Sequence, residues 1–142
     1  MPKQQRDLQK LYKFANDRNI VIEEVTRFTD KWMLGQYCGR FDFKPADDPD
    51  YLQDIHVKVK QGMYPSKRMC VIAHEIGHDK MSWDCYDRVA RETSAWEEGE
   101  KLLHQLNISI PNIFYRLRNL HLLTLRRLNC ENVLTVETTP GS

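Results

Sequence analysis

The sequence has no long apolar run, few cysteines and almost no net charge. No stretch of its 142 residues approaches the roughly eighteen apolar side chains that span a bilayer, and its first residues lack the apolar core of a secretion signal. The 4 cysteines are too few and too scattered for a disulfide-stabilised scaffold. With 21 basic and 20 acidic residues, a strongly basic nucleic-acid binder is not indicated. We therefore expect a cytoplasmic protein without membrane contact, and nucleic acid is not its expected partner.

The composition is that of an ordinary globular protein, with 41% hydrophobic and 29% charged residues. A chain of this length can bury one hydrophobic core, so we expect a single domain over residues 1–142. Its main part should cover about 4–106, followed by a helical extension at about 111–130. Any catalytic site must then share that one core.

Hydrophobic periodicity predicts an α+β fold in which helices alternate with short β-branched runs. The run IHVKV is typical of a half-buried strand, and we place it near a sheet edge. Ser66 is the predicted N-cap of the helix that follows. The predicted helices cover residues 4–16, 67–81, 87–106 and about 111–130, and the predicted strands lie within 19–25, 32–43, 55–59 and 133–137.

The stretch HEIGH places two histidines one helical turn apart. On a helix, His74 and His78 share a face, and Ile72 and Ile76 lie on the opposite side, so we expect the histidines to face away from the core. Two imidazoles at this spacing can bind one metal ion, and Glu75 lies where it can reach a water molecule on that ion. The alternative is a chance match on a solvated helix.

Gly77 lies between the two histidines, inside the predicted helix. A glycine in a helix interior costs about 1 kcal/mol relative to alanine. Its presence therefore predicts close approach by another backbone or by a substrate.

A catalytic zinc site needs a third protein ligand and one open position. On the wheel of the next predicted helix, Glu92 is the one carboxylate in the middle of the apolar face. A buried carboxylate requires a cationic partner, which a metal ion or a basic side chain supplies. Glu98 lies on the polar side and is the second choice, because its distance of twenty positions from His78 resembles that of thermolysin-like peptidases.

A closed structural site is the rival interpretation of the same helix. Cys70, His74 and His78 follow one another at intervals of four residues, and Cys85 comes shortly after, which are the ligands of a Cys2His2 site. Such a site leaves Glu75 and Glu92 without a role, and buried cysteines are usually apolar packing residues.

The segments HEIGH at 74–78 and ETSAW at 92–96 resemble the short gluzincins of the ImmA/IrrE type, over about residues 4–106. The resemblance implies a minimal zincin-like domain, with a small, mainly antiparallel sheet packed on the HExxH helix. It further implies Zn²⁺ as cofactor, with His74, His78 and Glu92 as metal ligands and Glu75 as catalytic base. Members of this family often cleave a helix-turn-helix repressor of a phage or mobile element, which suggests a protein substrate.

We therefore predict a zinc-dependent endopeptidase in which Glu75 takes a proton from the attacking water. The alternative is a non-catalytic zincin-fold module that inhibits or sequesters a partner protein. The two differ at Glu75, which only the enzyme requires.

Other residues receive provisional roles from their chemistry alone. A hydrogen-bond donor for the developing oxyanion could come from Tyr64, Tyr86, His104 or Tyr115, and Asp79 and Asp84 could orient the imidazoles. In the last helix, the leucine-rich side should be core or a dimer contact rather than a substrate groove. Its polar residues are interpreted as a solvated face: Arg116, Arg118, His121, Arg126 and Arg127.

Overall fold

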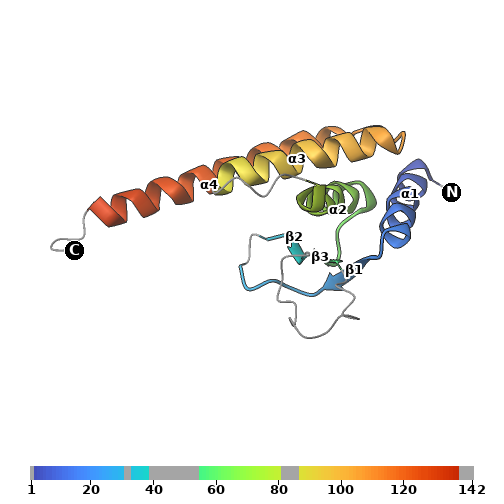
Figure 1. Cartoon of the computed structure of the whole chain (residues 1–142), viewed down its shortest axis with the longest axis horizontal. Coiled ribbons are helices and arrows are strands. Elements are labelled where there is room, and N and C mark those ends of the chain that lie inside the picture. The colour runs from blue at the N-terminus through green and yellow to red at the C-terminus, as the bar shows by residue number, and fades with distance from the viewer. Residues whose placement is uncertain (1, 31–32, 39–54, 81–86, 138–142) are drawn as a thin grey trace, which may run out of the picture.

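The computed structural model describes residues 2–30, 33–38, 55–80 and 87–137, without the side chains of 80 and 129–137. This part of the chain has an α+β fold with four helices and one small sheet (Figure 1). No helix in it is long and apolar enough to cross a membrane. In chain order the elements are α1 (Lys3–Asp17), β1 (Ile20–Val25), β2 (Gly35–Cys38), β3 (Ile55–Lys60), α2 (Pro65–Lys80), α3 (Arg88–Gln105) and α4 (Asn112–Glu137).

Helix α2 lies in the middle of the fold (Figure 1). It contacts β2 and β3 on one side, α3 and α4 on the other, and α1 at its flank. Every residue from 71 to 77 is buried. Ile72 and Ile76 lie in the hydrophobic core, as expected, and the histidines face away from it, into a cleft rather than open solvent. His74 is only 4% exposed.

The sheet is mixed, with the strand order β1-β3-β2. Strand β3 pairs in parallel with β1 and antiparallel with β2. Two expectations are thereby corrected, since the sheet is not mainly antiparallel and β3 is central rather than near an edge. The alternation of its side chains does hold, with Ile55, Val57 and Val59 buried. The alternation of apolar and polar side chains predicts which face of a strand is buried. It does not predict whether neighbouring strands pair with one or both of its edges.

The helix boundaries agree with the predicted ranges within a few residues, apart from three details. Helix α2 begins at Pro65, so Ser66 lies inside the first turn and is not the N-cap. Proline is well suited to that first position because it has no N–H to satisfy. Asp87 caps α3 by accepting a hydrogen bond from the Val89 N–H at 3.2 Å. Residues 133–137 continue α4 and do not form the expected strand.

Glycines allow α2 and α3 to pack backbone against backbone. A Cβ atom on Gly77 would lie 2.1 Å from the Ala95 carbonyl oxygen, and one on Gly99 would lie 2.8 Å from the Ala73 carbonyl oxygen. The close approach predicted for Gly77 is thus confirmed, with another backbone as the neighbour. This contact brings the middle of α3 against the histidine-bearing half of α2.

Candidate metal centre

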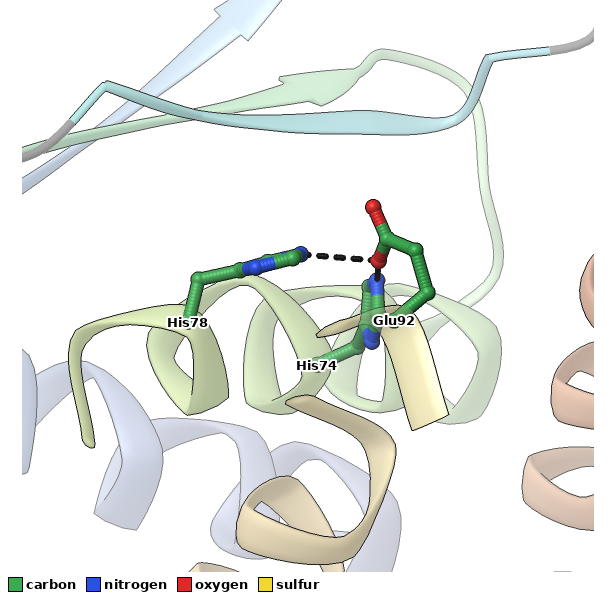
Figure 2. A group of neighbouring side chains, drawn as sticks. All are labelled: His74, His78 and Glu92. Carbon is green, nitrogen blue, oxygen red and sulfur yellow. Dashed lines mark ion pairs between the residues drawn. The ribbon is translucent and has the colours of Figure 1, made fainter. Parts of the chain in front are cut away.

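Three side chains from α2 and α3 converge at one point beneath β2 (Figure 2). The Glu92 Oε2 atom lies 3.0 Å from Nε2 of His74 and 2.9 Å from Nε2 of His78. His74 and His78 meet because they are one turn apart on α2, and the tight packing of α3 brings Glu92 to them. These are the residues for which sequence analysis predicted a shared metal ion.

The burial of these side chains sets their protonation. Burial lowers the pKa of His74 to about 4, so its imidazole is neutral at neutral pH. Burial also acts to lower the pKa of His78, but the nearby carboxylates of Glu92 and Glu75 outweigh it and the pKa is raised. For Glu92, burial acts to raise the pKa, but both imidazoles favour the carboxylate and the pKa is lowered. The cluster therefore combines an ionised carboxylate with imidazoles, which are the donors of a divalent metal site.

The arrangement of the three donor atoms fits a metal ion. Within the described ranges, His74, His78 and Glu92 form the one group of at least three His, Cys, Asp or Glu ligand atoms lying within 4.8 Å of one another. Tetrahedral bonds of about 2.1 Å separate ligand atoms by roughly 3.4 Å, close to the spacing found here. Apart from the two imidazoles, no residue in these ranges approaches the buried Oε2 atom of Glu92 as a donor. The group could hold a metal ion, which would satisfy that oxygen.

Glu75 lies beside this cluster without belonging to it. Its Oε1 atom is 3.5 Å from His74 Nε2, and the side chain is buried. Burial raises the pKa of Glu75 to about 8. A divalent cation at the cluster would favour the carboxylate, so Glu75 would then be ionised closer to neutral pH. Gly35 of β2 lies directly over this side chain, since a Cβ there would be 3.0 Å from Glu75 Cγ.

The structure does not bring the alternative ligands into this cluster. Glu98 lies on the outer part of α3 and pairs with Lys101 at 3.2 Å. Cys70 is completely buried in the hydrophobic core and does not join the group of ligand atoms. Burial raises the pKa of its thiol to about 12, which disfavours the thiolate that metals bind. Cys85, the other cysteine of the closed site, lies outside the described residues.

A thiol-labelling experiment checks the placement of Cys70. We expect Cys70 to react with iodoacetamide at pH 8 at least about 100-fold more slowly in the folded protein than in urea, because it is buried and protonated. The modified peptide is quantified by mass spectrometry. The rate should be the same with and without a chelator. Faster labelling of Cys70 in the folded protein after chelation would instead support the closed cysteine site.

A cleft opens beside the candidate metal centre. Its volume of about 360 Å³ is that of a small ligand pocket. Its walls come from β2, α2, α3 and α4, so α4 takes part in the site rather than forming a separate extension. Leu117 and Leu120 line this cleft, whereas Phe114 and Leu125 on the leucine-rich side of the same helix are buried, as expected for a side that faces the core. Several other residues line the cleft although no role in the site was predicted for them from sequence. They are Tyr37, Arg88, Arg91, Trp96, Thr124 and His121, the last of which was interpreted as part of a solvated face.

Tyr37 connects Asp79 with one histidine of the cluster. Its hydroxyl donates to Asp79 Oδ1 at 2.9 Å, and its ring stacks on His78 with centroids 5.9 Å apart. Asp79 thus contacts the side chain that stacks on His78, whereas Asp84 lies outside the described residues. No signal in the sequence relates Tyr37 to the histidines, because Tyr37 lies on a strand far from the HEIGH motif in the chain.

Three of the residues proposed from sequence as oxyanion donors lie in the described part of the chain, and none of these three lines the cleft. Tyr64 is 53% exposed, His104 lies near Glu100, and the Tyr115 hydroxyl donates to Glu100. Tyr86 lies outside the described residues. His121 does line the cleft, with its ring centroid 5.4 Å from that of His74. Burial lowers its pKa.

No protein-family model matches this chain, and searches of curated proteins and of solved structures found no significant match. The resemblance to the ImmA/IrrE type thus depends on the HEIGH and ETSAW segments alone. Any functional argument must therefore start from the geometry of the site.

Proposed function

We propose that this protein is a metal-dependent hydrolase whose working metal is zinc. More particularly, we propose a zincin-like endopeptidase of the ImmA/IrrE type that cleaves a specific protein substrate. The observation that supports this proposal is the convergence of His74, His78 and Glu92 around one point, with Glu75 at its side. Two histidines and one carboxylate leave a fourth position open, as in zinc hydrolases and unlike closed structural sites.

The residues of the site divide the chemistry between them. His74, His78 and Glu92 would hold the ion, which when bound activates water and polarises a carbonyl group. Glu75 would accept a proton from the water as its oxygen bonds to the scissile carbonyl carbon. The C–N bond then breaks, and Glu75 delivers this proton to the leaving amine. One peptide bond and one water thus give one carboxylic acid and one amine.

The cleft suits a polypeptide chain better than a small polar molecule. Apolar side chains line it from two sides, namely Leu34, just before β2, and Leu117 and Leu120 of α4. Among the described residues, β2 is an edge strand of the sheet and lines the cleft, so we propose that an extended chain pairs with its outer edge. The proposed substrate is therefore an extended protein segment with apolar side chains near the cleaved bond, and a helix-turn-helix repressor is one candidate.

Metal analysis of the purified protein tests the proposal. We expect about one zinc ion per chain in the wild type, and zinc affinity lowered about 100-fold or more in the Glu92→Ala variant, because a direct ligand is lost. Elemental analysis after dialysis against a weak chelator gives the stoichiometry. The matched control is Glu98→Ala, which removes a partly exposed carboxylate outside the cluster from the same helix and should leave the zinc content unchanged.

Other outcomes would contradict the proposed site. Zinc retained in Glu92→Ala but lost in Cys70→Ala would indicate a closed structural site. A wild-type protein that takes up no zinc even after reconstitution would exclude the peptidase.

A further inference from the structure

The imidazole of His121 is held in the cleft by a side chain that can only donate. Trp96 Nε1 donates a hydrogen bond to His121 Nδ1 at 3.1 Å. An indole N–H has no acceptor function, so the Nδ1 atom of His121 must accept and therefore carries no proton. In a neutral imidazole the single proton is then on Nε2. Trp96 thereby selects the tautomer of His121.

The position of this ring relates it to the candidate metal centre. His121 lines the same cleft as His74, His78 and Glu75. Its ring stands at 87° to that of His74, with centroids 5.4 Å apart. Trp96 stacks on His74 at 4.0 Å between centroids, so one indole ring touches both imidazoles. These contacts of Trp96 hold His121 of α4 in place relative to the candidate metal ligands of α2 and α3.

We infer that His121 is a substrate-contacting residue, whose Nε2–H donates a hydrogen bond to the carbonyl oxygen of the peptide bond that is cleaved. This inference rests on the proposed function and gives α4 a part in it. The negative charge on that oxygen grows as water adds to the carbonyl carbon, so a donor held in place stabilises the transition state more than the substrate. Trp96 is the positioning residue for this donor, because it occupies Nδ1 and leaves the proton on the other nitrogen.

Imidazole NMR tests the tautomer without any enzymatic assay. In the zinc-loaded protein labelled with ¹⁵N-histidine, we expect a two-bond ¹H–¹⁵N correlation spectrum at pH 7.5 to show His121 protonated at Nε2 and not at Nδ1. The Trp96→Phe variant, which keeps an aromatic ring but removes the donor, should shift His121 towards a mixture of tautomers. Protonation of His121 at Nδ1 in the wild type would overturn the inference.

Binding of acetohydroxamate tests the donor itself. This small oxygen ligand binds to zinc and places a negatively charged oxygen beside it. We expect His121→Ala to weaken its binding about 10- to 100-fold by calorimetry, since one hydrogen bond to a charged oxygen is lost, while zinc content stays at that of the wild type. His121→Gln, which keeps an N–H donor, should recover part of the affinity. The control is His104→Ala, whose histidine lies outside the cleft and is 70% exposed.

The outcomes separate this inference from the proposed function. A wild-type protein that binds no zinc would refute the proposed function and with it this role of His121. Bound zinc with equal acetohydroxamate affinity in wild type and His121→Ala would refute only the inference. Loss of zinc from His121→Ala would show a structural role for His121 and would also overturn it.

Discussion

Replacing Glu75 by Gln is expected to lower the rate of peptide-bond hydrolysis about 10³-fold while zinc content and fold are retained. Glutamine has the same shape but cannot accept the proton of the attacking water, and general bases contribute about 10²- to 10⁴-fold. The fold should tolerate the change, because the buried Glu75 side chain becomes a neutral amide. Hydrolysis is followed by mass spectrometry as new chain termini in a mixture of unfolded proteins, at equal zinc loading.

The matched control is Glu97→Gln, the same change at an exposed position of α3. It should leave the hydrolysis rate within twofold of the wild type. If a zinc-loaded wild type and Glu75→Gln both bind a partner protein and neither cleaves it, the non-catalytic binding module is the better interpretation. If Glu75→Gln cleaves as fast as the wild type, Glu75 is not the base.

Gly77→Ala is expected to reduce the free energy of unfolding by about 3 kcal/mol. In an isolated helix alanine would be favoured by about 1 kcal/mol, but here the added Cβ would lie 2.1 Å from a backbone oxygen of α3. A backbone atom cannot move aside as a flexible side chain can, so α2 and α3 must separate. We expect weaker zinc binding as well, because separation moves Glu92 away from the histidines. Urea unfolding of the metal-free protein measures the first effect, and zinc titration measures the second.

Two other glycines provide a graded comparison. Gly99→Ala should cost less than Gly77→Ala, because its Cβ would lie 2.8 Å from the Ala73 oxygen. Gly62 meets no atom within 4 Å but has a φ of 88°, so Gly62→Ala should cost about 1 kcal/mol through backbone strain and leave zinc binding unchanged. If Gly77→Ala were as stable as the wild type, the close backbone packing of α2 on α3 at Gly77 would be contradicted.

Sequence alone identified most of the candidate metal centre. The spacing of His74 and His78 places them on one helix face whatever surrounds the helix, since backbone geometry fixes it. The choice of Glu92 over Glu98 also came from a local pattern, because a carboxylate in the middle of an apolar face requires a partner. The structure brings Glu92 to the histidines and leaves Glu98 beside Lys101.

The rest was decided by tertiary structure. The mixed pairing of β3, the burial of α2 on both sides and the arrival of Tyr37 and His121 at the cleft all depend on contacts between segments far apart in sequence. No periodic pattern encodes such contacts. A histidine on the polar side of a helix is interpreted as solvated until the neighbouring elements are placed. The sequence by itself therefore favoured the three residues of the candidate metal centre, whereas only the packing of α4 on α3 determined that His121 faces the same cleft.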